Sequence, residues 1–522
     1  MYEEATRLMT EEGDYSGCLE ETRRLIKEGA CDDQIYVLEA SALEALGRRS
    51  EELESISNGL RANYRNYELF YMLGLFYLDE NINKSYLCFT QSLWYLELLY
   101  EDSNNGSSNL RKKAECNKTI EEIDIDRKQI HQMISQLEMR PDMDVRKTSF
   151  AILSYDDNGY MQENLEAIRK YCVPDSYEII VVDNASTDGV TDYLRLQEDI
   201  ALIENDENVG FSIGCNQAVR ACSPMNDIFL LNNDAILTPN ALFWLKMALY
   251  EDRNVGAVGP VSNNATVQSV EDYLNADRKG SLLTQMAGAE RIGSYDDWFE
   301  YAIHLNVPSD NPYENRARLT GFAVLIKREV ISKVLIEGDL LDTVFSPAYF
   351  EDDDLGIRIA QAGYRQILVH NAFVYHYGGA GFDESNKVME NSRNNFMAKW
   401  GFDMWDYEAP DEDVIANITD DKKAPIRVLE VGCGMGVTLS RIKYLYPNSY
   451  VTGVSFRTDV ASCGKYLADI RCEQLLTFNE IFPEHSFDYI IVSEAMKSAP
   501  DEAKAEVGDK IRGLLRDGGR FL

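Results

Sequence analysis

A short apolar run that ends in three polar residues is the feature that most restricts the fold of this chain. Residues 227–237 read Asp-Ile-Phe-Leu-Leu-Asn-Asn-Asp-Ala-Ile-Leu, and the four residues from Ile228 onward are all apolar. A run this short that is apolar on both faces is typical of a buried parallel strand. Ligands bind outside the carboxyl ends of such strands, so Asn232, Asn233 and Asp234 are expected at a ligand site. The alternative is an Asn-Asn-Asp turn that only caps the next helix.

Composition excludes several classes of function. The chain has 522 residues, of which 45% are hydrophobic, and a formal net charge of −37. This acidity argues against nucleic-acid binding, which requires a basic surface, and against a polybasic membrane anchor. The N-terminus lacks the features of a signal peptide, and no apolar stretch is long enough to span a membrane. The ten cysteines form no C-x-x-C pair, so we expect reduced thiols in a cytoplasmic protein.

The first part of the chain has the apolar spacing of helices and a weak repeat. Gly13, Gly47 and Asn81 lie 34 residues apart, each at an expected turn between two helices. A helix-turn-helix repeat of this length resembles the tetratricopeptide array, which presents a concave groove to peptides or proteins. An ordinary helical bundle is the alternative. We expect helical repeats over residues 1–105 and a helical connector over 106–144. The polar break at 102–108 predicts that a cut there exposes little core.

From Thr148 onward, short apolar runs alternate with amphipathic segments. Strands are expected at 150–153, 177–182, 201–203 and 228–231, with helices between them. This alternation predicts an α/β domain with a mostly parallel sheet. The stretch 262–318 has no clear strand pattern and is expected to cover the acceptor side of the site.

Several motifs follow one another in this region. They are Asp183-Asn184-Ala-Ser-Thr-Asp-Gly, Asn208-Val-Gly210-Phe, Asn232-Asn233-Asp234, Leu319-Thr-Gly321-Phe, Glu351-Asp352-Asp353-Asp354 and Val374-Tyr-His376-Tyr-Gly-Gly. Together they resemble family 2 glycosyltransferases, which have the Rossmann-like GT-A fold. The motifs fall in the family's order over residues 145–400, and the closest likeness is to the branch that includes rhamnosyltransferases and protein-modifying transferases.

The resemblance implies an inverting, metal-dependent transfer of a hexose or deoxyhexose from a UDP- or dTDP-linked donor to a hydroxyl group. Asp234 and His376 would hold Mn²⁺ or Mg²⁺, which offsets the charge of the leaving diphosphate. Asp352 would be the catalytic base, and Asp354 is a second candidate for that role. The competing interpretation is that these acids cap the helix that follows. The residues expected to contact the substrates are Ser154, Asp156, Asp183, Asn184, Asn208, Gly210, Asn232, Asn233, Gly321, Glu351 and Asp354.

After an acidic linker over 401–424, a strand runs into a glycine-rich turn within the unit 425–522. The turn contains Gly432, Gly434 and Gly436 and follows Glu430. This unit resembles a class I S-adenosylmethionine methyltransferase of Rossmann type, which makes these four residues candidates for binding the methyl donor. Ser455 stands where the family has an acid for the ribose, and the chain stops before the last expected strands. We therefore expect a truncated or degenerate domain with little or no affinity for S-adenosylmethionine.

These observations predict a multidomain bacterial protein with an all-α repeat in front, a GT-A transferase in the middle and a methyltransferase-like domain behind. The repeats favour a protein acceptor, such as a surface or flagellar subunit. The alternatives are a transferase that extends a polysaccharide or lipid-linked glycan, and a scaffold with a decayed methyltransferase module.

Overall fold

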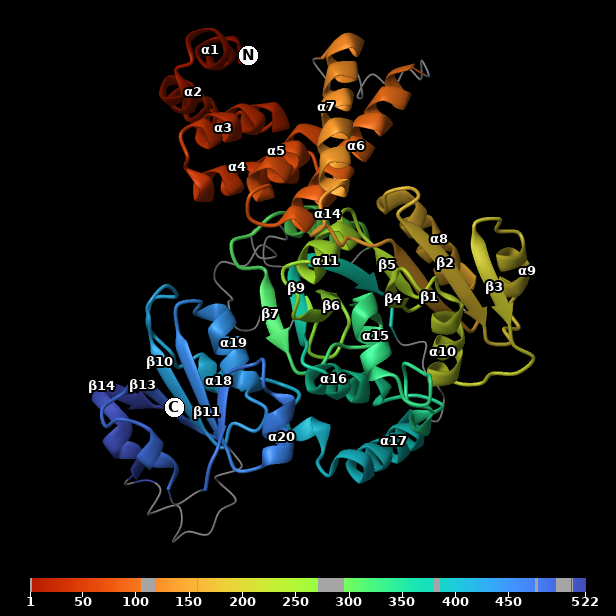
Figure 1. Cartoon of the computed structure of the whole chain (residues 1–522), viewed down its shortest axis with the longest axis vertical. Coiled ribbons are helices and arrows are strands. Elements are labelled where there is room, and N and C mark those ends of the chain that lie inside the picture. Colours follow the sequence, from red (N-terminus) through yellow and green to blue (C-terminus); the bar gives the residue numbers. More distant parts are fainter. Residues whose placement is uncertain are drawn as a thin grey trace.

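Three parts follow one another along the chain in the computed structural model, which describes residues 2–104, 118–156, 158–270, 295–378, 385–474, 477–493, 508 and 510–522. N-terminal helices stand on a central domain built around a mixed sheet, and a smaller parallel sheet lies on the opposite side of that domain (Figure 1). This architecture confirms the fold class that the sequence predicts.

The N-terminal helices form pairs at the expected spacing. Aspartate or asparagine caps begin three of them: Asp14, Asp32 and Asn66 each accept a hydrogen bond from a backbone N–H in the first turn of the next helix. The helices are α1 (Glu3–Arg7), α2 (Tyr15–Lys27), α3 (Asp33–Ala45), α4 (Arg49–Ala62), α5 (Tyr67–Tyr77), α6 (Ile82–Asn104) and α7 (Ile120–Glu138).

Small residues shape the repeat. Gly47 connects α3 to α4 with a φ of 68°, a left-handed conformation that glycine adopts without strain. On α5, a Cβ added to Gly74 would lie 2.7 Å from the ring of Phe89 on α6, so glycine is needed for the close packing of this pair. The helix pairs confirm the 34-residue period, whereas their assignment as tetratricopeptide repeats stays a prediction.

The central sheet has the strand order β3-β2-β1-β4-β8-β6-β9-β5, with β7 also paired to β9. The strands from β3 to β4 are parallel, as expected, whereas β8 runs antiparallel to both of its neighbours. The strands are β1 (Thr148–Ser154), β2 (Tyr177–Asp183), β3 (Ile200–Glu204), β4 (Asp227–Leu231), β5 (Ala235–Leu237), β6 (Val255–Val261), β7 (Tyr313–Arg316), β8 (Ala323–Ile326) and β9 (Arg365–His376). Strand β7 lies in the stretch for which the sequence predicts no strand.

Helices cover both faces of this sheet, which explains why its strands are apolar at consecutive positions. Phe229 of β4 packs in the core under α8 and α11, and its neighbour Leu230 packs in the core under α10, α15 and α16. All five residues of β4 are buried. These helices, with three more, are α8 (Asn158–Tyr171), α9 (Val190–Arg195), α10 (Phe211–Ala221), α11 (Ala241–Leu249), α14 (Tyr295–Leu305), α15 (Arg328–Val334), α16 (Glu351–Gln361) and α17 (Ser385–Trp400).

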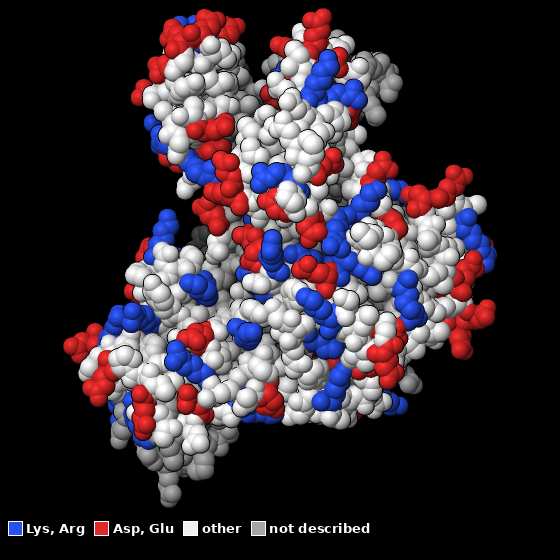
Figure 2. Space-filling model, viewed as in Figure 1, with Lys and Arg blue, Asp and Glu red and all other residues white. Residues whose placement is uncertain are grey.

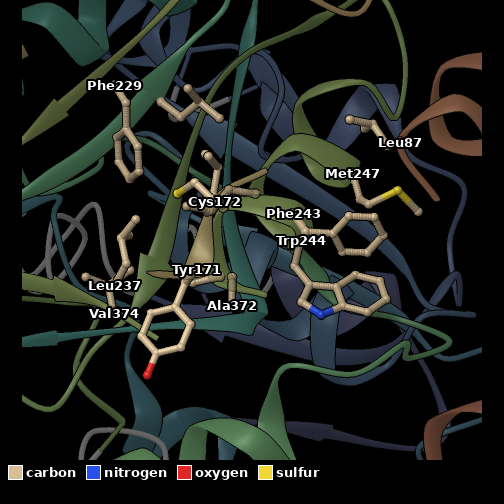
Figure 3. Close-up of a cluster of buried hydrophobic side chains, with 14 of the residues drawn as sticks. Leu87, Tyr171, Cys172, Phe229, Leu237, Phe243, Trp244, Met247, Ala372 and Val374 are labelled. Atoms are coloured by element: carbon tan, nitrogen blue, oxygen red, sulfur yellow. The ribbon is translucent and has the colours of Figure 1, made fainter. Parts of the chain in front are cut away.

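The core under α11 continues into the N-terminal helices. The rings of Phe70 on α5 and Phe243 on α11 meet edge to face with centroids 5.2 Å apart. Figure 3 shows Leu87 of α6 beside Phe243, Trp244 and Met247 of α11 in this cluster. The expectation that residues 1–105 can be cut away with little exposed core is therefore wrong, because α5 and α6 share their buried face with the central domain.

Replacing Phe70 by alanine should destabilise both parts together. Phe70 is fully buried, and truncating a buried phenylalanine costs about 3–5 kcal/mol because it removes apolar contacts and leaves a cavity. Urea unfolding followed by circular dichroism should show the loss. Tyr15→Ala is the control, since this aromatic residue on α2 is 40% exposed. Equal unfolding midpoints for the two variants would contradict the shared core.

The C-terminal domain is a parallel sheet with the order β12-β11-β10-β13-β14. It contains β10 (Arg427–Val431), β11 (Tyr450–Ser455), β12 (Asp469–Cys472), β13 (Phe487–Val492) and β14 (Leu515–Phe521), with α18 (Glu412–Ile415), α19 (Val437–Leu445) and α20 (Thr458–Cys463). Strand β12 was not expected from the sequence. The stretch 401–424, expected as a linker, is packed: Met404 is fully buried, and Ile415 and Ile418 join the core of the C-terminal domain.

A buried charged cluster joins this domain to the central one. Glu314 on β7 lies 2.7 Å from Nε2 of His370 and 3.2 Å from Nη1 of Arg441 on α19. Its carboxyl is 1% exposed, and burial would raise its pKa. The charges of Arg316 and Arg441 and the hydrogen bond from His370 outweigh that effect and lower the pKa to about 2.

Charge is unevenly spread over the surface. Acidic side chains gather at the free end of the N-terminal helices, at the upper left of the face in Figure 2. Within the part of the chain that the structure describes, none of the helices combines the length and the apolar character needed to cross a bilayer.

Candidate active site

A cavity of about 660 Å³ opens where β1, β2 and β4 end, at the edge of the sheet that the sequence predicts for ligand binding. It brings together predicted residues from segments far apart in the chain. Those that line it are Asn184, Asn208, Asn232, Asn233, Asp234, Gly321, Glu351, Asp352 and His376.

Strand pairing places Asp234 beside His376. Ala235 at the start of β5 pairs with His376 at the end of β9, so the preceding Asp234 lies next to the imidazole. Oδ1 of Asp234 is 3.3 Å from Nε2 of His376, and Oδ2 accepts a hydrogen bond from the backbone N–H of Gly378 at 3.0 Å. The His376 ring also stacks on Phe322 with centroids 4.8 Å apart.

The His376 ring is held in one orientation. Its Nδ1 lies 2.6 Å from the carbonyl oxygen of Asn264, which can only accept, so Nδ1 carries a proton and Nε2 faces Asp234. Burial lowers the pKa of His376, but the hydrogen bond to Asp234 and the charge of that carboxylate outweigh burial and raise it above its ordinary value.

This pair fits a divalent cation. A carboxylate oxygen and an imidazole nitrogen, oriented by a backbone carbonyl on its other nitrogen, are ligands that Mn²⁺ accepts in proteins. Among the described residues no group of three or more His, Cys, Asp and Glu side chains could hold a metal. The pair would therefore need further ligands from a bound molecule, such as diphosphate oxygens.

Asp352 lies in the first turn of α16 on the cavity wall. Its Oδ2 accepts a hydrogen bond from the backbone N–H of Gly321 at 3.0 Å, and its Oδ1 accepts one from the N–H of Asp353 at 2.9 Å. The two residues before α16, Tyr349 and Phe350, have φ angles of 74° and 70°. Such left-handed conformations are strained for aromatic residues and occur mainly where the surrounding structure fixes a functional site.

The guanidinium of one arginine lies within ion-pair distance of three carboxyl groups on this wall. Arg318 Nη1 is 3.0 Å from Asp353 and 3.7 Å from Asp352, and its Nη2 is 3.0 Å from Glu408. Burial raises the pKa of Asp353 to about 7 despite the charge of Arg318. Burial and the charge of Asp352 hold the pKa of Glu351 well above its ordinary value. Glu351, Asp352 and Asp353 thus do more than cap α16, because their charges interact with one another and with Arg318 on the cavity wall.

Asparagine side chains organise the donor side of the cavity. Asn184 donates from Nδ2 to Asn208 at 2.7 Å, and its Oδ1 accepts from the backbone N–H of Val209 at 3.0 Å. The amide nitrogen of Asn233 is buried and has no hydrogen-bond partner within the described part of the chain. It is therefore a donor left for a ligand.

Five predicted contacts lie outside the cavity lining: Ser154, Asp156, Asp183, Gly210 and Asp354. Both oxygens of Asp183 accept hydrogen bonds from nearby hydroxyls, one from Ser186 in the loop after β2 and one from Thr191 at the start of α9. Asp156 accepts from the backbone N–H of Thr187, and Ser154 is fully buried. These three residues shape the loops after β1 and β2, whereas Asn184 faces the cavity.

Gly210 and Asp354 have packing roles. A Cβ on Gly210 would lie 2.8 Å from Pro347, so this glycine permits close packing of two loops. Asp354 is fully buried and binds Arg358 at 2.8 Å and Trp400 Nε1 at 2.9 Å. The expectation that Asp354 contacts the substrate is not supported, because its carboxylate is directed away from the cavity toward these two side chains.

Sequence reasoning missed several residues of the cavity wall, among them Tyr155, Arg318, Trp405 and Glu408. Tyr155 lies between the predicted residues Ser154 and Asp156, and Arg318 directly precedes the motif that begins at Leu319. These positions could have identified both residues as candidates for the site. Trp405 and Glu408 lie in the stretch expected to be a linker, and no local pattern distinguishes them.

The glycine turn of the C-terminal domain forms as predicted. Gly432, Gly434 and Gly436 have φ angles of 87°, 56° and 82°. Glu430 at the end of β10 accepts a hydrogen bond from Ser493 at 2.5 Å, and burial raises its pKa to about 7. A Cβ on Gly434 would overlap the ring of Tyr407, so a side chain of this same protein covers the turn.

The protein should therefore not bind S-adenosylmethionine measurably. Tyr407 covers Gly434. Ser455 has no carboxylate to bind the ribose hydroxyls, and its own hydroxyl already donates a hydrogen bond to the backbone carbonyl of Arg457. Calorimetric titration with S-adenosylmethionine and S-adenosylhomocysteine should give no heat of binding. Micromolar affinity for either compound would show that Tyr407 leaves the turn readily.

Two family models match parts of the chain. The model described as glycosyl transferase family 2 matches residues 149–301, and the model described as methyltransferase domain matches residues 428–519. Both matches confirm the resemblance that the sequence motifs carry. No curated protein matches the chain.

Several solved structures show a low similarity to parts of the chain. A mannosyltransferase from Pyrobaculum calidifontis in complex with GDP-Man and Mn²⁺ is 17% identical, with a TM-score of 0.34 over 58% of this chain and 73% of that one. GalNAc-T7 with UDP, GalNAc and Mn²⁺ is 13% identical, with a TM-score of 0.37 over 51% and 50%. PKMT2 from Rickettsia typhi in complex with AdoHcy is 24% identical, with a TM-score of 0.18 over 19% and 20%.

Proposed function

Because the chain carries a family 2 glycosyltransferase domain ahead of a methyltransferase-like domain, we propose that it is a metal-dependent, inverting glycosyltransferase. The observation that carries the proposal is that Asp234, His376 and Asp352 line one cavity at the carboxyl ends of the strands. In this proposal the donor is a UDP- or dTDP-linked hexose or deoxyhexose.

Asp234 and His376 would hold Mn²⁺ or Mg²⁺ beside the donor diphosphate. When bound, the ion offsets the negative charge that develops on the leaving diphosphate. Asn232 and Asn233 come directly after β4 and face the same space, so their amides are suited to hold donor oxygens. The Asn184–Asn208 pair would bind the nucleoside, which is supported by the position of both side chains on the cavity wall.

Asp352 would accept the proton of the acceptor hydroxyl as its oxygen attacks the anomeric carbon. The bond from that carbon to the diphosphate oxygen breaks, and its electron pair leaves with the diphosphate. A single displacement inverts the configuration at the anomeric carbon. The N–H groups of Gly321 and Asp353 fix the carboxylate of Asp352 in place for this step.

The acceptor proposed is a protein hydroxyl, and the N-terminal helix pairs support this because repeats of this kind bind polypeptides. A cytoplasmic location is proposed as well. Cysteines are free throughout the described residues, and most of them are buried, as in proteins from reducing compartments.

Hydrolysis of nucleotide sugars without an acceptor provides the test. The full chain is incubated with a panel of UDP-, dTDP- and GDP-sugars, with Mn²⁺, with Mg²⁺ or with EDTA, and the released nucleotide is measured. One donor should be hydrolysed with metal and not with EDTA. Hydrolysis of no donor under any condition would overturn the proposal. The preferred donor then serves to compare protein and glycan acceptors by intact mass.

A further inference from the structure

The segment 402–408, which we name the strap, is a shared wall of the two α/β domains. On its cavity side Trp405 and Glu408 line the transferase cavity. On its other side Tyr407 lies against Gly434 in the glycine turn. Because the strap is short, both contacts depend on one continuous piece of chain.

Both α/β domains hold the strap through one apolar cluster that contains Phe402 and Met404. The C-terminal domain contributes Met435, Val437 and Val460 to this cluster, and the transferase domain contributes Phe345, Phe350 and Phe396. The backbone carbonyl of Gly401, just before the strap, accepts a hydrogen bond from Arg457 at 2.9 Å. The position of Glu408 in the cavity therefore depends on contacts from the C-terminal domain as well as from the transferase domain.

The transferase domain meets the strap with charged groups. Arg393 on α17 stacks its guanidinium on the ring of Trp405, 3.9 Å from the centroid, and its Nε donates to Asp403 at 2.8 Å. Arg318 donates to Glu408 at 3.0 Å from the same guanidinium that faces Asp352 and Asp353.

We propose that Glu408 is a positioning residue of the transferase, and that the methyltransferase-like domain serves the transfer reaction by clamping the strap that carries it. This inference rests on the proposed function. Glu408 draws Arg318 toward the strap, so the guanidinium does not form a close ion pair with Asp352, whose carboxylate must stay free to take a proton.

Charge explains why this arrangement matters. The charged and titratable groups around Asp352 are Glu351 and Asp353 on α16, Arg318 before β8 and Glu408 on the strap. If Glu408 loses its charge, Arg318 keeps ion pairs with Asp352 and Asp353 alone. The negative charge that holds its guanidinium at the strap is then gone. The guanidinium of Arg318 is then free to turn from the strap toward Asp352 and to pair closely with the carboxylate oxygen that must take the proton.

The first test is Glu408→Gln in the full chain, assayed by metal-dependent hydrolysis of the preferred nucleotide sugar. We expect the rate at pH 7 to fall roughly three- to tenfold, with the loss in kcat rather than in KM. Binding of Mn²⁺ and nucleotide should stay within about twofold of wild type. Asp406→Asn is the matched control, because it removes the same charge from an exposed strap residue outside the cavity.

The second test is Tyr407→Ala, which removes the contact with the glycine turn and leaves Glu408 in place. It should lower the rate as Glu408→Gln does, and Tyr407→Phe should restore it because the ring remains. Tyr450→Ala, at an exposed tyrosine of the same domain, is the control for general destabilisation.

The outcomes separate the two claims. A wild-type kcat in Glu408→Gln would overturn the positioning role, and a wild-type rate in Tyr407→Ala would overturn the clamp. If Asp352→Asn is inactive while both strap variants behave as wild type, the proposed function stands and only this inference fails. If the wild-type chain hydrolyses no donor, the proposed function itself fails.

Discussion

Replacing Asp352 by asparagine is expected to lower sugar transfer by about 10²-fold or more, the usual contribution of a general base. Asparagine keeps the size of the side chain, and its carbonyl oxygen can still accept the hydrogen bond that Gly321 donates at 3.0 Å. It cannot take the proton of the acceptor hydroxyl. Calorimetric binding of Mn²⁺ and nucleotide should stay near wild type, so the loss should be seen in kcat rather than in donor affinity.

Asp354→Asn distinguishes the two candidates for the base. Asp354 is fully buried between Arg358 and Trp400, so its substitution should lower the thermal stability rather than stop the chemistry of folded protein. An Asp354→Asn variant that is folded but inactive, beside an active Asp352→Asn variant, would move the role of base to Asp354.

Alanine at Asp234 or His376 should abolish metal-dependent binding of the nucleotide sugar without unfolding the chain. The two side chains are the expected protein ligands of the metal. Loss of a residue that only supports a metal ligand lowers metal affinity by about 10- to 100-fold. Loss of a ligand itself should therefore lower metal affinity by at least about 100-fold. Titration of Mn²⁺ in the presence of nucleotide measures this effect.

His131→Ala is the control for His376→Ala, since His131 lies on the exposed side of α7. The melting temperatures of all three variants should lie within a few degrees of wild type. Full activity of the wild-type protein in EDTA, or unchanged Mn²⁺ affinity in Asp234→Ala, would contradict the metal site.

Residues next to strand ends could be predicted from the sequence, because the strand and the polar residues that follow it belong to one short, continuous segment. The apolar run before Asn232 and Asp234 determines that β4 is buried and that these polar residues lie at its carboxyl end. His376 could be found only through the family motif, because its partner Asp234 is brought to it by the pairing of β5 with β9.

The remaining residues depend on contacts between distant segments. Nothing in the sequence around Glu408 shows that Arg318 lies 3.0 Å away, since this contact requires the packing of two domains. The local pattern likewise treats Asp183 and Asn184 alike. Only the folded loop shows that hydroxyls of Ser186 and Thr191 occupy the carboxylate and leave the amide facing the cavity.

The buried carboxylate of Glu314 makes the junction between the two sheets sensitive to acid. Its pKa of about 2 in the folded protein lies below the ordinary value of 4.5, so its contribution to stability is present above pH 4.5 and is lost as the pH falls toward 2. Protonation would leave Arg441 and Arg316 buried without their shared counter-charge. Scanning calorimetry should therefore show the central and C-terminal domains melting in one cooperative transition at neutral pH. The same scan near pH 2 should show two separate transitions, with the C-terminal domain released first.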